Sequence, residues 1–146
     1  MRPSRSNRLV AFCYLTAMIT ALARPAIADA TLYDQLGGQA GLTTIVRHMV
    51  DLVTTDPRTK DDFDNINLDR LRGRIRDFLC HVADGPCIYK GRPMAAAHEG
   101  LDLTQAKFNA VAEDLQTAME QVGIPYRTQN RLMARLAPLE RNIVTK

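Results

Sequence analysis

Apolar residues recur along most of this chain with the period of an α-helix. Three stretches space them three and four residues apart, which places them on one face of a helix. These stripes run from Leu42 to Val53, from Leu68 to Val82 and from Phe108 to Val122. A fourth stripe near the end of the chain consists of Leu132, Met133, Leu136, Leu139 and Val144. No stretch alternates apolar and polar residues for long enough to predict a strand, so the pattern predicts an all-α fold.

Capping and helix-breaking residues give these helices their bounds. A short helix beginning at Thr31 is predicted to end at Gly37-Gly38, and the third long helix at Gly123. Side chains that can cap a helix precede three of the predicted helices: Thr31, Asn67 or Asp69, and Thr104. Gly73 falls in the middle of the second long helix, where glycine costs about 1 kcal/mol relative to alanine. It therefore predicts the close approach of a neighbouring segment.

The first thirty residues differ from the rest of the chain. Three arginines, at positions 2, 5 and 8, precede an uncharged apolar run over residues 9–23. Pro25 follows, with small residues suited to cleavage at Ala26-Ile27-Ala28 or Ala28-Asp29-Ala30. This layout is typical of a secretory signal peptide, and the run is short for a membrane span. We predict a signal peptide over 1–28, with cleavage after 28 or 30, and one exported, periplasmic domain over 29–146. An uncleaved amphipathic anchor is the alternative.

Removal of residues 1–28 changes the charge balance. That segment contains four arginines and no acidic residue, which leaves 15 of the 19 basic residues against all 16 acidic ones. The apparent basicity of the chain thus belongs to the export signal. The remaining domain has no charge excess that would indicate binding to nucleic acid or to an anionic membrane, and we expect no stable membrane span after processing.

Two cysteines of the predicted domain, Cys80 and Cys87, flank a turn at Asp84-Gly85-Pro86. In an oxidising compartment they are candidates for a disulfide across this turn, which would contribute roughly 2 kcal/mol. Two unpaired thiols are the alternative. The spacing and the missing partner ligands argue against a structural zinc site.

Candidate chemistry lies in the stretch from Tyr89 to His98. It begins beside a turn, becomes compatible with a helix at Met94, and places one histidine four residues later. A single imidazole on a short alanine-rich helix could coordinate a flat metal cofactor from one side, although such a histidine can also be a surface or capping residue. The chain has no tryptophan, and polar connecting segments around Phe63 and Lys90 separate short predicted helices. Both features favour an embedded apolar cofactor.

Taken together, these residues resemble the group I truncated haemoglobins over essentially the whole predicted domain. The residues that carry the resemblance are Leu32-Tyr33-Asp34-Gln35-Leu36-Gly37-Gly38, Asp56-Pro57, Phe63, Gly85-Pro86, Tyr89-Lys90-Gly91-Arg92-Pro93-Met94, His98, Phe108, Gly123-Ile124-Pro125 and Ala137-Pro138-Leu139. The resemblance implies a truncated globin fold, a two-over-two helical sandwich around haem b. The helices beginning near Leu42 and Leu68 would form one pair, and those beginning near Thr104 and Asn130 the other.

The resemblance also assigns roles to single residues. His98 corresponds to the proximal iron ligand, Phe63 to a phenylalanine that stacks on the haem, and Arg74 to a basic residue that can pair with a propionate. The other predicted haem contacts are Leu71, Ile75, Met94 and Phe108. If Cys80 and Cys87 pair, their disulfide would clamp the segment that leads to the proximal helix.

The predicted distal side departs from the family pattern. Members usually have a tyrosine at the position of Val50 and a glutamine at one of the positions of Leu71 and Ile75. All three are aliphatic here and cannot donate a hydrogen bond to a bound ligand. His48 and His81 lie off the predicted haem-facing stripes and are poor substitutes.

The resemblance predicts a haem protein that binds O2, NO or CO at ferrous iron, in ligand binding, sensing or scavenging, with a reductase that the sequence does not identify. The apolar distal side argues against stable oxygen carriage. The enzymatic alternative is nitric oxide dioxygenation or a peroxidase-like reaction, and peroxide cleavage usually needs a distal acid–base group. A haem-free helical interaction module is a third reading, against which Phe63 and His98 argue.

Overall fold

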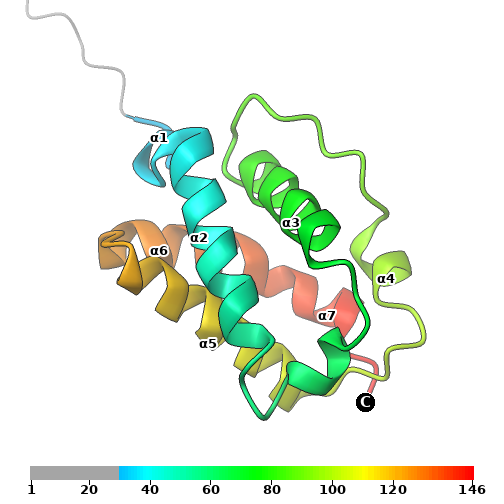
Figure 1. The fold of residues 1–146 in the computed structure, drawn as a ribbon. Coiled ribbons are helices and arrows are strands. Elements are labelled where there is room, and N and C mark those ends of the chain that lie inside the picture. The colour runs from blue at the N-terminus through cyan, green and yellow to red at the C-terminus, as the bar shows by residue number, and fades with distance from the viewer. Residues whose placement is uncertain (1–29) are drawn as a thin grey trace, which may run out of the picture.

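The computed structural model describes residues 30–146, and over these residues the chain is helical, with no strand (Figure 1). The α-helices are α1 (Leu32–Gln35), α2 (Gly38–Val53), α3 (Leu68–Val82), α4 (Met94–Ala97), α5 (Gln105–Gln121), α6 (Tyr126–Leu136) and α7 (Glu140–Ile143), and two 3-10 helices are η1 (Lys60–Phe63) and η2 (Ala137–Leu139). The predicted all-α fold is confirmed. The predicted signal peptide lies outside the described residues.

Helix α2 is central to the packing. It contacts both α3 and α5, while α6 contacts α1, α3 and α5. In Figure 1, α2 and α3 form one layer, and α5 and α6 cross behind it. The predicted stripe of α2 is the middle of the core, where Leu42, Ile45, Val46, Met49, Val50 and Val53 are all buried. The two predicted helix pairs are therefore the two layers of the sandwich.

Most of the predicted helix ends are observed, and their caps explain them. The Thr31 side chain accepts from Asp34 N, and Asn67 accepts from Arg70 N. The Thr104 hydroxyl accepts from Lys107 N at 3.2 Å. Gly37 joins α1 to α2 with φ +85°, a conformation that glycine adopts without steric cost.

Helix α6 begins at Tyr126, four residues before the predicted start at Asn130. The carbonyl of Pro125 accepts hydrogen bonds from the amides of Thr128 and Gln129 at 2.8 and 3.1 Å, so the backbone is already helical there. A proline is well tolerated at such a start, because its missing amide would have had no partner within the helix.

The prediction that a neighbouring segment approaches Gly73 closely is wrong. A Cβ atom built on Gly73 would meet nothing within 4 Å. The residue instead lines a surface groove of about 450 Å³ between α2 and α3. Arg72 lines the same groove, and its guanidinium bonds to Asp51 and Asp69 at 2.9 and 3.2 Å. Charged side chains thus occupy the surface beside Gly73.

Arg58 joins the segment after α2 to α5. Its guanidinium contacts Asp56 and Glu113, each at 2.6 Å. Hydrogen bonds from Arg58 hold the pKa of the Asp56 carboxyl below its usual range.

Asp114, next to Glu113, is only 7% exposed, and its Oδ2 atom has no hydrogen-bond partner. Burial, reinforced by the charge of Asp56, raises the pKa of Asp114 above its ordinary value of 3.8.

The raised pKa of Asp114 predicts a pH-dependent loss of stability. The folded chain keeps the Asp114 proton to higher pH than the unfolded chain, so the free energy of unfolding falls as pH rises above 3.8. We expect Asp114→Asn to be more stable than wild type near pH 7 by on the order of 1 kcal/mol, and to lose this advantage at acidic pH. Urea unfolding near pH 3 and pH 7 measures both, with the exposed Asp61→Asn as control. An equal difference at both pH values would refute the assignment.

Within residues 30–146, no helix combines the length and the apolar character that crossing a bilayer requires.

Candidate functional site

His98 follows a single helical turn. Helix α4 begins after Pro93, and His98 caps its carboxyl end, half-buried. Nδ1 of the imidazole lies 2.8 Å from the carbonyl oxygen of Met94. A carbonyl oxygen only accepts hydrogen bonds, so Nδ1 must donate and the neutral ring has its lone pair on Nε2. Histidines that ligate metals are usually oriented in this way, by a hydrogen bond from the second ring nitrogen.

Helix α3 has an apolar face that the protein covers only in part. Along this helix only Leu79 and Cys80 are buried. The other members of its apolar stripe contact the core but stay half-exposed: Leu68, Leu71, Ile75, Phe78 and Val82. Phe63, at the end of η1, has the same intermediate exposure. A row of large apolar side chains left half-covered suits a large apolar ligand.

The remaining predicted site residues lie on several elements. Met94 begins α4 and Phe108 lies in the first turn of α5, and both are half-buried. Arg74 is exposed on α3, and its Nη1 donates to the carbonyl of Lys90 at 3.3 Å, which ties α3 to the segment before α4. Val50 differs from Leu71 and Ile75 because it is completely buried in the core.

A cluster around Tyr89 was not among the predicted site residues. The Tyr89 ring packs edge-on against Phe78, with 5.2 Å between centroids. It stacks beside His81, with 6.4 Å between centroids and 23° between the ring planes. Its hydroxyl donates to the carbonyl of Arg92 at 3.0 Å. The sequence feature that could have predicted this cluster is the aromatic residue that begins the stretch from 89 to 98, Tyr89 itself. His48 is engaged elsewhere, with Nδ1 2.8 Å from Oε1 of Gln121.

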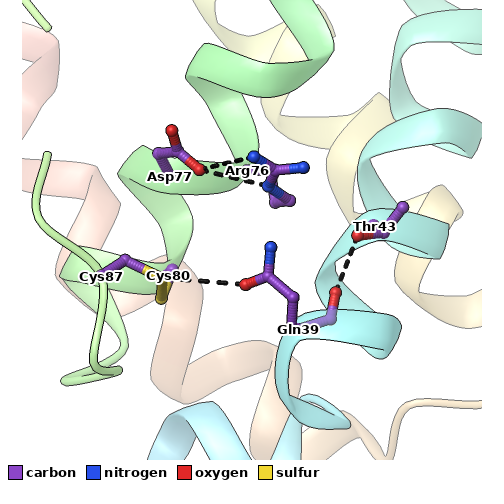
Figure 2. The surroundings of a disulfide bond; sticks show 6 residues. All are labelled: Gln39, Thr43, Arg76, Asp77, Cys80 and Cys87. Carbon is purple, nitrogen blue, oxygen red and sulfur yellow. Dashed lines mark hydrogen bonds and ion pairs between the residues drawn. A yellow bond between two sulfur atoms is a disulfide. The ribbon is translucent and has the colours of Figure 1, made fainter. Parts of the chain in front are cut away.

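Cys80 and Cys87 are joined by a disulfide, with their Cα atoms 5.9 Å apart (Figure 2). Cys80 lies in the last turn of α3 and is completely buried, whereas Cys87 lies in the following segment. The bond therefore spans the turn that leads away from α3.

Two surface grooves contain none of the predicted haem-site residues. One is the groove beside Gly73, and the other, of about 620 Å³, lies between α1 and α6. The second is lined by Arg127, Arg131, Arg135 and Asp84, among others. Charged linings of this kind do not suit an apolar ring system. The candidate site is therefore defined by His98 and the half-covered face of α3.

The donor set of this site fits a metal held by a macrocycle. Among residues 30–146, no group of three or more histidines, cysteines or acidic residues is arranged to hold a metal ion. A porphyrin supplies four ligands of its own, so its iron needs only one protein ligand, such as Nε2 of His98. Apolar contacts to the ring and one cation for its carboxylates complete what such a group requires.

A family model for bacterial-like globins matches residues 31–145. The chain belongs to the bacterial-like globin family. Group 1 truncated hemoglobin GlbN of Mycolicibacterium paratuberculosis is 32% identical over 116 residues, covering 80% of this chain and 85% of that protein. GlbN of a Nostoc species is 31% identical, covering 80% of this chain and 98% of that protein. The globin is thus of the group I truncated type.

A solved structure supports the same fold. The truncated hemoglobin of Tetrahymena pyriformis, in its Fe(III) form, superposes with a TM-score of 0.77 at 28% identity, covering 80% of this chain and all of that chain. The predicted truncated globin fold is confirmed. Haem b is the cofactor of such a globin, and the free Nε2 of His98 and the apolar face of α3 fit it.

Proposed function

We propose that this truncated globin holds haem b through Nε2 of His98 and binds diatomic gases on the opposite, apolar side. Haem bound there would supply an iron that can take up O2, NO or CO. The observation that carries this proposal is the hydrogen bond from Nδ1 of His98 to the Met94 carbonyl, at 2.8 Å. It fixes the ring in the tautomer that a metal requires.

The other site residues have distinct roles in this proposal. The half-exposed rings of Phe63 and Phe108 and the thioether of Met94 offer the porphyrin apolar contacts. Arg74 is exposed and holds only a 3.3 Å bond to the Lys90 carbonyl, so its guanidinium can turn to a propionate. A pair between the guanidinium and a propionate carboxylate is stronger than the bond to the uncharged Lys90 carbonyl that it replaces, because both partners are then charged.

Among the described residues, the three that we place on the distal side have no hydrogen-bond donor in their side chains. Leu71 and Ile75 are half-buried on α3, and Val50 is completely buried on α2. Oxygen bound to ferrous iron gains more from a donor than CO or NO, because it bears more negative charge. We propose that the protein releases oxygen quickly and acts in binding, sensing or scavenging of NO or another small ligand.

A haem titration tests this proposal directly. Haemin added to the purified apoprotein should give a sharp Soret band that saturates at one equivalent. Reduction should then leave the iron able to bind CO. Failure of the Soret band to develop would refute the proposal and leave a haem-free helical scaffold.

We also propose that the protein is exported to the periplasm. The support is the order of features in residues 1–28: arginines, an uncharged apolar run, a proline and small residues. Cell fractionation followed by intact mass measurement is the test. A periplasmic protein that begins at residue 29 or 31 would agree with it, and a cytoplasmic protein that keeps residues 1–28 would contradict it.

A further inference from the structure

The position of His98 depends on the segment between α3 and α4. Residues 83–93 form no helix and run back along α3 before α4 begins (Figure 1). Helix α4 itself has four residues, and a single turn is not stable alone. Its main helix neighbour is α7, at the end of the chain. Whatever fixes residues 83–93 therefore helps to place the imidazole.

The disulfide fixes the beginning of this segment to the core. Gly85 N donates to the Cys80 carbonyl at 2.8 Å, and Tyr33 N donates to the Ala83 carbonyl at 3.0 Å. The turn is tightly packed, because a Cβ atom on Gly85 would lie 2.6 Å from Cys80 Sγ and 2.6 Å from the Tyr33 ring. These contacts fix the path of the chain as it leaves α3.

Contacts of Tyr89 fix the rest of the segment. Tyr89 packs on Phe78 of α3, and its hydroxyl bonds to the Arg92 carbonyl, two residues before α4. Tyr89 lies two residues after Cys87, so its position along α3 depends on where Cys87 is held.

We propose that the Cys80–Cys87 disulfide, with Tyr89, is a positioning element for His98, and that its reduction loosens the bond between His98 and iron. This inference rests on the proposed function, since it assumes that His98 holds haem iron. The disulfide constrains the segment from one end and Tyr89 aligns its middle. Opening the bond frees residues 86–93 to move relative to α3, and α4 with them.

A reducing agent can reach the disulfide through Cys87. Cys80 is completely buried, whereas Cys87 is partly exposed. A dithiol would attack Sγ of Cys87, forming a mixed disulfide and releasing Cys80 as a thiolate that takes up a proton. The second thiol of the reagent then displaces Cys87, so the S–S bond of the protein becomes two thiols and the dithiol becomes a disulfide.

The structure offers the Cys87 thiol of the reduced protein a hydrogen-bond acceptor. Sγ of Cys87 lies 3.8 Å from Oε1 of Gln39, which is on the first turn of α2 (Figure 2). A disulfide sulfur has no hydrogen, so this contact becomes a hydrogen bond only when Cys87 is a thiol. Gln39 therefore offers the reduced Cys87 only one weak hydrogen bond in place of the covalent bond to Cys80.

The test compares oxidised protein, dithiol-treated protein and the Cys80→Ala/Cys87→Ala variant. All three carry Cys13→Ser, which removes the third cysteine of the chain, and the dithiol is removed before measurement. Transfer of haem to an apoglobin acceptor gives the haem-loss rate, and resonance Raman of the ferrous protein gives the iron–histidine stretching band. We expect opening the disulfide to speed haem loss about tenfold and to shift or broaden that band. Dithiol should change nothing further in the double variant. Tyr89→Phe, which keeps the ring but loses the bond to Arg92, should have a smaller effect.

Two outcomes would overturn the inference in distinguishable ways. Normal haem uptake with an unchanged haem-loss rate and an unchanged iron–histidine band after reduction would refute the positioning role alone. A chain that takes up no haem when oxidised would refute the proposed function and the inference together. If the double variant fails to fold, as judged by circular dichroism, the dithiol-treated protein still provides the comparison.

Discussion

Replacing His98 with alanine is expected to remove the iron ligand and to weaken haem binding by more than about 100-fold. Loss of an outer partner of a metal ligand typically costs 10–100-fold in affinity, and loss of the ligand itself should cost more. Haemin titration measures the affinity, and the ferrous spectrum should lose its histidine-ligated form. Added imidazole should restore that form, because it can occupy the space left by the side chain.

The chain supplies a matched control for this substitution. It has three histidines, and the other two are placed differently. His48 bonds to Gln121, and His81 is exposed at the end of α3 and stacked beside Tyr89. Because His81 contacts Tyr89, His48→Ala is the matched control, and it should keep wild-type haem affinity and spectra. A His98→Ala protein that binds haem as well as wild type would show that another residue holds the iron.

Placing a donor on the apolar side of the site is expected to slow oxygen release by about 10- to 100-fold. Leu71→Gln introduces an amide of similar volume at a half-buried position of α3. A hydrogen bond to a charged acceptor contributes about 1.5–3 kcal/mol, which would stabilise bound oxygen. Stopped-flow measurement of the oxygen dissociation rate tests this, and the rate for CO should change much less.

Leu71→Met is the control for this change, because it keeps the side chain apolar and of similar size. It should leave the oxygen dissociation rate within a few-fold of wild type. Slow oxygen release from the wild-type protein would contradict the proposed open distal side. Slow release would instead favour nitric oxide dioxygenation, which requires oxygen to stay bound long enough to react.

The fold was largely predictable because its helices are strongly patterned. The stripe from Leu42 to Val53 is the core face of α2, and Asn67 and Thr104 cap the helices that the sequence assigned to them. Errors arose where local signals have two physical readings. Glycine in a helix can mark a close approach or an open surface, and Gly73 marks a surface groove.

The site was predictable in its residue types but not in its detailed arrangement. A sequence pattern can single out His98, yet the tautomer of its ring depends on a carbonyl that only the folded α4 places beside it. The bond from Arg74 to Lys90 and the packing of Tyr89 on Phe78 depend on how residues 83–93 return along α3. Such irregular segments have no periodicity from which contacts can be inferred.

The visible spectrum of the ferrous protein, with and without CO, tests the central claim most directly. A haem held by His98 with an open apolar opposite side should be five-coordinate and high-spin in the ferrous state. It should convert fully to a low-spin form with CO. A six-coordinate, low-spin ferrous spectrum before CO is added would contradict the account, because it would mean that a side chain of the protein already occupies the position assigned to the gas.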